Sequence, residues 1–383
     1  MNINNWLQNN LIFMTVHGSQ CYGLANELSD LDMKGIVIPP KEVENNLFQK
    51  FEQAENNEEL HKAFEHLKNP KNPKIESTVF SLRKFITLAA NINPNIVELL
   101  WTDPSDHLVF NKPMNILMDN RELFLSSKAK FTFSGYAYSQ LAKIERHRKW
   151  IVRGELSEPK RKDFGLPDET PKRVGEIFGL IKSEVERWNL TRYSLTNMER
   201  DELKSDIWEL IYNVSKIDVN EGNWSKKYEA GVIERLAKEY NLKDEVVDIL
   251  NRERLYKKEM EMYKSWFTWK TGRNPARHAL EVKSGYDTKH ASHLVRLMRM
   301  GLEILTEHKV IVKRPDREEI LSIKNGGWSY EQVMDFAKDM QVRLDEAYKI
   351  TTLPKSVDFE KVNALYHKLF EGYHSQPLEG AWG

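Results

Sequence analysis

The sequence predicts an α+β protein in which a small mixed sheet near the start of the chain is followed by a predominantly helical part. Two short apolar runs bounded by turns, LIFMTV (11–16) and MKGIVI (33–38), are typical of buried strands. The segment IESTVFSL (75–82) alternates polar and apolar residues, as a half-buried strand does. From about residue 84 onward, apolar residues recur at helical spacing in segment after segment.

The length of the chain predicts more than one domain. It has 383 residues, and a single hydrophobic core stops growing near about 250 to 300 residues. We expect a first domain at residues 1–125, with 41–75 as an inserted helix or lid of low structural constraint. A helical domain at 126–350 and a C-terminal tail helix at 351–383 should follow.

The predicted elements follow in order along the chain. The segment GSQCYGLANELSD (18–30) has the small and polar residues of a turn and short helix between the first two strands. The third strand should place Glu76, Thr78 and Phe80 on one face. Helices are expected in RKFITLAANI (83–92), VERWNLTRY (185–193) and IWELIYNVSKI (207–217), and a late short strand in KVIVKR (309–314).

The composition limits the class of protein. Lys plus Arg and Asp plus Glu balance at 57 each, so any contact with nucleic acid must come from local patches. Cys21 is the single cysteine, which excludes an intramolecular disulfide framework and a cysteine-rich zinc site. No apolar stretch of about 18 residues occurs and no secretory signal is apparent, so we expect a cytosolic protein.

One motif near the start of the chain carries a chemical prediction. Gly18-Ser19 ends the first apolar run, and Asp30-Leu31-Asp32 opens the second. Carboxylates at positions i and i+2 of a strand point to the same side, where they can share Mg²⁺ ions. The turn before them leaves room for phosphate oxygens near backbone N–H groups. A helix cap or Asx turn is the structural alternative for this motif.

A third carboxylate should complete a two-metal site of this kind. Glu76 is the favoured candidate because it opens the strand expected beside Asp32. Glu98, in NPNIVELLW, is the rival candidate. Its apolar neighbours favour a packing role.

These residues resemble the signature of the DNA polymerase β superfamily of nucleotidyltransferases, in which a Gly-Ser turn precedes an Asp-x-Asp pair on the next strand. Further segments are similar to predicted bacterial and phage nucleotidyltransferases that include an RNA-ligase-associated group. They are FSLRKF with NPNIVELLW, FSGYAYSQLAKIERHRKW, RKDFGLP, and GYDTKHASHLVRLMRMGLEIL with WSYEQV. The resemblance is scattered over about residues 11 to 335.

The resemblance implies roles for particular residues. Gly18 and Ser19, with Ser29, would bind the nucleoside triphosphate. Asp30 and Asp32 would ligate Mg²⁺ or Mn²⁺, and Glu76 would take the third carboxylate position. Members of the superfamily often have Asp there, so the longer Glu76 is a departure.

A second cluster begins at Tyr286. If Thr288 caps a helix, then Lys289, His293 and Arg296 share one face, which is suited to triphosphate or an RNA backbone. A solvated cationic face is the plain alternative. Tyr286 and Asp287 would contact base or ribose, or Asp287 would cap the helix. The pair His290 and His293 lacks further ligands in the sequence, so no zinc site is expected.

A third candidate binding region is basic and contains an aromatic residue among its cations, a combination that suits single-stranded RNA. The alternative is an exposed helix end followed by a basic loop. The region comprises Arg146, His147, Arg148, Lys149, Trp150, Arg153, Lys160, Arg161 and Lys162. The same two interpretations, RNA contact and solvent exposure, apply to Arg273 and Arg277.

The resemblance predicts a metal-dependent enzyme that transfers a nucleoside monophosphate to an acceptor hydroxyl. The candidate acceptors are an RNA 3′ end, such as that of tRNA, a protein side chain and a small molecule. A nucleotide-binding sensor without transfer activity and an RNA-binding accessory protein are the alternatives. The sequence contains no GxSxG, GxxxxGK[ST] or GxGxxG motif, which argues against serine hydrolase, P-loop and Rossmann functions.

Overall fold

The computed structural model describes residues 6–169, 175–176 and 244–375. The chain forms two compact units, one made of Met1–Val152 with Asn274–Gly383 and the other of Arg153–Arg273. The predicted boundary at 125/126 therefore falls inside the first unit. The predicted helices at 185–193 and 207–217 lie outside the described residues.

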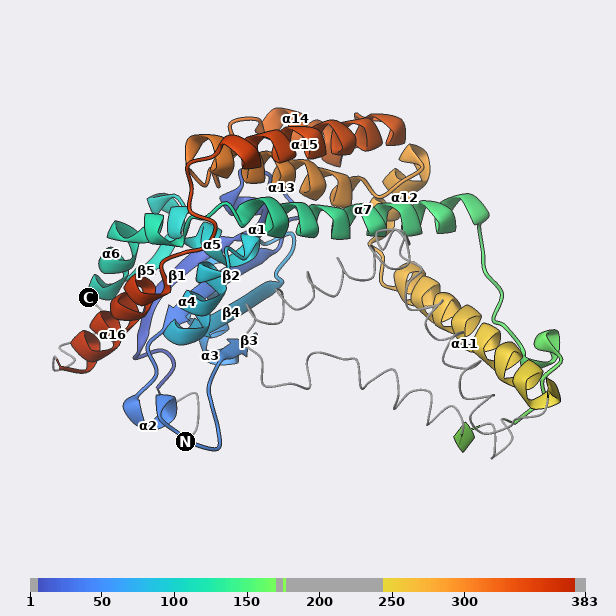
Figure 1. Ribbon diagram of the computed structural model, residues 1–383, viewed down its shortest axis with the longest axis horizontal. Coiled ribbons are helices and arrows are strands. Elements are labelled where there is room, and N and C mark those ends of the chain that lie inside the picture. Colours follow the sequence, from blue (N-terminus) through green and yellow to red (C-terminus); the bar gives the residue numbers. More distant parts are fainter. Residues whose placement is uncertain (1–5, 170–174, 177–243, 376–383) are drawn as a thin grey trace. The chain divides into compact units, whose positions relative to one another are not determined.

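A five-stranded mixed sheet forms the centre of the first unit, in the order β3-β4-β2-β1-β5 (Figure 1). Its strands are β1 (Leu11–His17), β2 (Leu31–Val37), β3 (Gln53–Glu55), β4 (Ile75–Ser81) and β5 (His107–Phe110). β2 and β4 are parallel, and the other pairings are antiparallel. The sheet and the helices that follow it confirm the predicted α+β class and the three predicted strands.

Apolar side chains cover both faces of this sheet. Phe80 and Ile36 belong to a large core that the helices complete, whereas Val79 and Met33 belong to a smaller core on the opposite face. Because side chains alternate along a strand, this division confirms that Phe80 and Val79 point to opposite faces.

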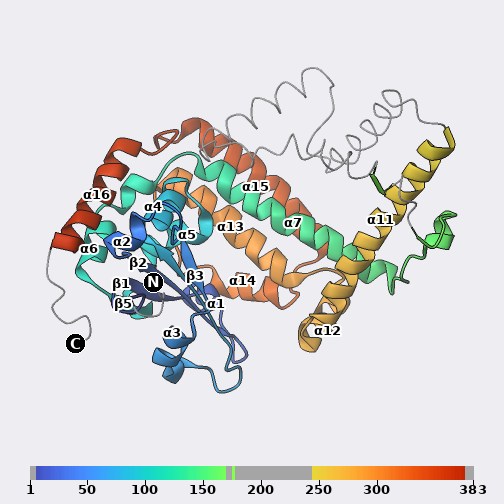
Figure 2. The same cartoon turned by 90° about the horizontal axis from the view of Figure 1, so that it is seen from below.

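The first unit also contains helices, many of which contribute side chains to the large core (Figures 1 and 2). Those from the first part of the chain are α1 (Gly18–Cys21), α2 (Lys41–Glu44), α3 (Glu58–Ala63), α4 (Leu82–Ala90), α5 (Pro94–Val97), α6 (Lys112–Asp119) and α7 (Ala129–Arg153). Those from the last part are α12 (Pro275–Ser284), α13 (Thr288–Glu307), α14 (Arg317–Lys324), α15 (Tyr330–Ile350) and α16 (Phe359–Ser375). Several begin with a side-chain cap. For example, Ser81 Oγ accepts a hydrogen bond from Lys84 N at the start of α4.

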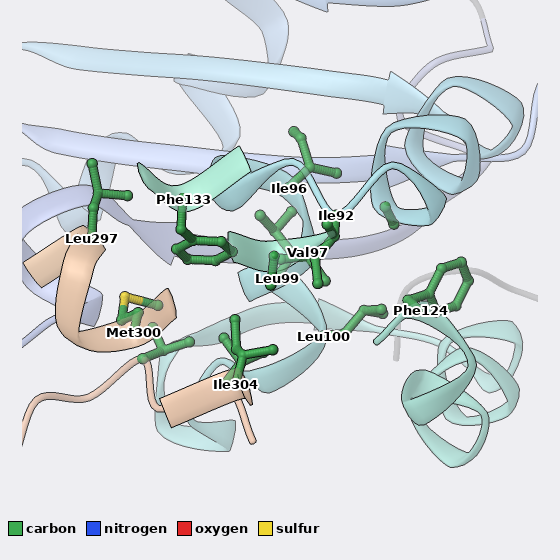
Figure 3. Packing of buried hydrophobic residues seen from close by; sticks show 14 of the residues in the cluster. Ile92, Ile96, Val97, Leu99, Leu100, Phe124, Phe133, Leu297, Met300 and Ile304 are labelled. Atoms are coloured by element: carbon green, nitrogen blue, oxygen red, sulfur yellow. The ribbon is translucent and has the colours of Figure 1, made fainter. Parts of the chain in front are cut away.

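The large core joins segments that are far apart in the sequence. Figure 3 shows Phe133 of α7 beside Leu297 and Met300 of α13, with Ile96 and Val97 of α5 nearby. Gly301 of α13 permits this approach, because a Cβ there would lie 2.9 Å from Phe133 Cβ. The helix α13 is therefore part of the same core as the sheet.

The inserted segment 41–75 is more constrained than the sequence predicts. It contains β3 and α3, and it places Leu60 and Phe64 in the smaller core. Asn69 Nδ2 donates to the backbone oxygens of Glu27 and Ser29, and Asn72 Nδ2 donates to that of Leu28. The insertion thus covers one face of the sheet and holds the loop before Asp30.

One predicted strand needs correction, and another strand was not predicted. Residues 309–314 form no strand, although Val310 and Val312 are buried, because this segment packs its apolar side chains into the large core without a neighbouring strand. Instead, β5 follows Pro104 and pairs with β1 at the edge of the sheet. Its four residues are too few to give a clear alternating pattern in the sequence.

The second unit contains α11 (Asp244–Thr271) and a short 3₁₀ helix at Arg161–Phe164. Arg161 forms an ion pair with the fully buried Glu253 of α11. Among the described residues, no helix is long and apolar enough to cross a membrane.

Candidate functional site

Three carboxylates meet at one end of the sheet. Asp32 of β2 lies beside His17 of β1 and beside Glu76 of β4 in the strand register. Asp30, Asp32 and Glu76 each offer an oxygen within 4.8 Å of the others. The structure therefore brings together the two aspartates and the favoured third carboxylate.

The alternation of side chains explains why these groups share a face. Asp32 lies four residues before Ile36 on β2, and Glu76 lies four residues before Phe80 on β4. Ile36 and Phe80 are buried in the large core, so the same face of both strands carries apolar side chains at one end and carboxylates at the other.

Gly18 is required at the end of β1 for two reasons. Its φ is +64°, in the left-handed region that favours glycine. A Cβ at this position would also collide with Oδ2 of Asp32. The Asp32 carboxylate thus packs directly against the backbone of the Gly18 turn.

The environment of Asp32 suits a bound cation. Burial and the negative charges of Asp30 and Glu76 together raise the pKa of Asp32 to about 6, although Lys289 and Lys34 oppose the rise. A divalent cation among the three carboxylates would relieve this repulsion, and carboxylate oxygens are the ligands that Mg²⁺ prefers. The residues present therefore fit such an ion.

Glu98, the rival third carboxylate, lies elsewhere. It is 1% exposed, accepts hydrogen bonds from His17 Nε2 at 2.7 Å and Tyr22 Oη at 2.6 Å, and pairs with Arg296 at 3.3 Å. Burial raises the pKa of Glu98, but His17 and Arg296 outweigh this and hold it at about 2. Glu98 is a charged member of a buried network beneath the carboxylate cluster.

The predicted cationic face of α13 is only partly available. Lys289 is exposed. His293 is half-buried and stays neutral, since burial, Arg296 and Lys289 lower its pKa well below the usual value. Arg296 is 4% exposed, with its guanidinium 3.7 Å from the centre of the Tyr22 ring, so it serves the buried network and not a ligand. This placement argues against the predicted role of Arg296 in nucleotide binding.

Tyr286 and Asp287 also have structural roles. Tyr286 is fully buried and donates a hydrogen bond to Trp328 O at 2.8 Å, so its placement argues against contact with base or ribose. Asp287 accepts from His290 N as the cap of α13 and pairs with Arg277 and His147. Its capping role, the alternative from the sequence, is confirmed.

The two predicted serines differ in what they do. Ser29 Oγ accepts a hydrogen bond from Asn26 N at 2.9 Å and donates to Asn26 Oδ1, so it shapes the turn before Asp30. Ser19 follows Gly18 in α1, and its backbone oxygen accepts from Leu24 N at 2.7 Å. Its hydroxyl makes no hydrogen bond with another described residue, so it is available to a ligand.

Two lysines near the cluster were missed in the sequence. Lys34 lies two residues after Asp32 on β2 and therefore on the same face of the sheet, a spacing that could have revealed it. Its Nζ donates a hydrogen bond to Asn95 O at 2.7 Å. Lys324 ends α14. Burial lowers its pKa, as does Lys289, whereas Asp30 raises it. Nothing in the sequence around Lys324 marks it, because only the packing of α14 brings it near Asp30.

The predicted basic region is divided between the two units. In the first unit Trp150 is 6% exposed and stacks on His147, and Arg148 lies over the Tyr330 ring, whereas Arg146 and Lys149 are exposed. In the second unit Arg161 pairs with Glu253. The expected arrangement of an exposed aromatic ring among free cations is therefore not found at Trp150.

A polar cavity of about 350 Å³ opens beside the carboxylate cluster. Asp32 and Glu76 line one side of it, and Glu55, Asn56 and Thr78 line another. Neither Gly18 nor Lys289 borders this cavity. The carboxylates thus lie between the Gly18 turn and a separate pocket.

The sheet and its carboxylate cluster lie in the part of the chain that matches a known family. More particularly, residues 1–154 match the model of the RlaP family, described as an RNA repair pathway DNA polymerase beta family. This match confirms the superfamily resemblance predicted from the sequence, and it includes all three carboxylates. Comparison with curated proteins and with solved structures found no match.

Proposed function

We propose that the protein transfers a nucleoside monophosphate from a nucleoside triphosphate to a hydroxyl group of RNA. The observation that carries the proposal is the meeting of Asp30, Asp32 and Glu76 beside the glycine turn at Gly18. The family description, which names RNA repair and DNA polymerase β, supports both the reaction class and the acceptor.

Asp30, Asp32 and Glu76 would hold Mg²⁺ or Mn²⁺. When bound, these ions stabilise negative charge on the phosphates and lower the pKa of a coordinated hydroxyl. The protein contributes fixed positions for its carboxylates. Asp32 packs against Gly18, and the loop before Asp30 is held by Asn69 and Asn72.

The triphosphate would lie on the side of the cluster formed by the Gly18 turn. Ser19 offers a hydroxyl there. Lys289 lies close enough to oppose the rise in the pKa of Asp32, and Lys324 lies close enough to Asp30 for that carboxylate to raise the pKa of Lys324. Both lysines would therefore supply positive charge beside the cluster. Ammonium groups are suited to phosphate oxygens in such sites. We assign these four residues to triphosphate binding.

The reaction is an in-line displacement at phosphorus. The acceptor oxygen forms a bond to the α phosphorus, the bond from that phosphorus to the bridging oxygen breaks, and pyrophosphate leaves with the electron pair. The hydroxyl proton passes to solvent. Catalysis of this kind depends mainly on position and charge, which the carboxylates and lysines provide.

The test is incubation of the purified protein with each α-³²P nucleoside triphosphate, Mg²⁺ or Mn²⁺, and pooled small RNAs, beside the Asp30→Asn/Asp32→Asn variant. Label in RNA only with the intact aspartates supports the proposal. Triphosphate binding without transfer would indicate a nucleotide sensor. RNA binding that survives in the variant, with no transfer by either protein, would indicate an accessory protein.

A further inference from the structure

The polar cavity beside Asp32 and Glu76 is built on two neighbouring rows of one sheet face. In the first row Glu76, Asp32 and His17 lie side by side across β4, β2 and β1. In the second row Glu55, Thr78 and Lys34 lie side by side across β3, β4 and β2. A molecule in the cavity would therefore contact the second row while reaching the carboxylates of the first.

The inserted segment supplies the wall that faces the carboxylates. Asn56, directly after β3, has a φ of +49° and is held by two hydrogen bonds. Its backbone N–H donates to Ser77 O at 2.8 Å, and its Oδ1 accepts from Ser77 N at 3.1 Å. The position of Asn56 is thus fixed before any ligand binds.

Three polar groups that line the cavity remain available. The Thr78 hydroxyl and Asn56 Nδ2 make no hydrogen bond with another described residue. Glu55 accepts one hydrogen bond from Gln53 Nε2 at 2.7 Å, which leaves its second carboxylate oxygen open. A carboxylate, a hydroxyl and an amide together match the donors and acceptors of neighbouring hydroxyl groups.

The cavity does not suit a nucleobase. No Phe, Tyr or Trp lines it, so base stacking of the kind that holds single-stranded nucleic acid is absent from this pocket. Its volume of about 350 Å³ is at the lower end of the range for small-molecule sites. A single sugar fits these properties better than a base.

We infer that this cavity binds the terminal ribose of the acceptor RNA, with Glu55, Asn56 and Thr78 contacting its hydroxyl groups. One hydroxyl of the ribose would then face Asp32 and Glu76 and attack the α phosphorus as described above, with pyrophosphate leaving. The inference rests on the proposed function. It adds the acceptor subsite and a preference for ribose over deoxyribose.

The test compares Glu55→Gln and Thr78→Val with the wild-type protein, using RNA that ends in a ribose and the same RNA ending in a 2′-deoxyribose. Glu59→Gln is the matched control, because Glu59 is exposed on α3 of the same insertion and does not line the cavity. Transfer kinetics give KM for RNA and for the triphosphate. Fluorescence anisotropy without triphosphate gives RNA affinity independently of transfer.

Loss of one hydrogen bond involving a charged or polar group should raise KM and Kd for ribose-ended RNA about tenfold in each variant. KM for the triphosphate should stay unchanged, and Glu59→Gln should behave as wild type. RNA with the deoxyribose end should bind the wild-type protein about tenfold more weakly than RNA with the ribose end. The two substitutions should weaken the binding of the deoxyribose-ended RNA little further.

The inference would be overturned if both variants had wild-type values of KM for RNA, or if they lost equal affinity for the two RNA ends. Transfer by the wild-type protein would in that case still support the proposed function. Label on the protein itself in place of RNA would also overturn the inference. Failure of the wild-type protein to label any acceptor would instead overturn the proposed function, and the acceptor subsite with it.

Discussion

Asp32 and Glu76 occupy paired positions on the parallel strands β2 and β4. Parallel pairing puts both side chains on the same face at the same end of the sheet, although 43 residues separate them in the sequence. The insertion that fills this separation also forms the wall of the neighbouring cavity. The insertion therefore both brings Glu76 back beside Asp32 and forms part of the neighbouring pocket.

Glu76→Gln should lower kcat at least about 100-fold, because an amide replaces one of three charged metal ligands. The thermal unfolding temperature should change little, since the side chain is 49% exposed. Steady-state transfer assays and thermal unfolding measure the two effects. An active Glu76→Gln protein would remove this residue from the metal site.

Glu98→Gln should lower the free energy of unfolding by about 3 kcal/mol at pH 7, because Arg296 would lose its buried partner. The pKa of Glu98 is held at about 2, below the usual value of 4.5, so its contribution is complete above pH 4.5 and is lost as the pH falls toward 2. Urea unfolding at several pH values should show the difference between wild type and variant narrowing below pH 4.5. A difference that does not depend on pH would contradict this charge assignment.

Gly18→Ala should reduce kcat by about 100-fold, because the new Cβ displaces the Asp32 carboxylate. Gly154→Ala is the control for backbone strain, since Gly154 has a φ of +79° but no atom within 4 Å of its Cβ position. Transfer kinetics and thermal unfolding of both variants separate the two effects. Equal activity in the two variants would mean that contact with Asp32 is unimportant.

Asp32→Asn should stabilise the metal-free protein at pH 8 by about 1 kcal/mol, a value reduced for partial exposure of the side chain. The pKa of Asp32 is raised to about 6, so the folded protein binds the proton more tightly than the unfolded chain does. The advantage of the variant should therefore grow between about pH 4 and pH 6 and stay constant above. Added Mg²⁺ should stabilise the wild-type protein in thermal unfolding and have little effect on the variant.

Lys289→Gln and Lys324→Gln should each raise KM for the triphosphate about tenfold, since each removes a charge beside the phosphates. KM for RNA should stay close to wild type. Lys283→Gln on α12 provides an exposed control away from the carboxylates. An unchanged KM for the triphosphate in both variants would place the phosphates elsewhere.

The approach of Asp30, Asp32 and Glu76 could be predicted because the signals in the sequence are local. Gly18, Asp30 and Asp32 lie within one turn and one strand, and alternation along β4 was enough to favour Glu76 over Glu98. The contribution of α13 could not be predicted in the same way. Helical spacing places Lys289, His293 and Arg296 on one face, but it does not show that Glu98 and Tyr22 bury Arg296.

The pocket wall illustrates a second limit. Glu55 and Asn56 lie in a charged, Asn-rich segment that has the composition of a loose insertion. Their place beside Thr78 depends on the antiparallel pairing of β3 with β4 and on the burial of Leu60. A strand of three residues leaves too short a pattern to be recognised without that tertiary context.

The first unit has a consequence for the order in which the protein is made. Its core includes Phe133 of α7 together with Leu294 and Leu297 of α13, yet the chain between these helices belongs largely to the second unit. A ribosome that has released only the first 154 residues has produced all three carboxylates without α13, which contributes much of the large core. Completion of this core must then wait until α13 has been made, and a fragment limited to those residues should aggregate where the whole chain does not.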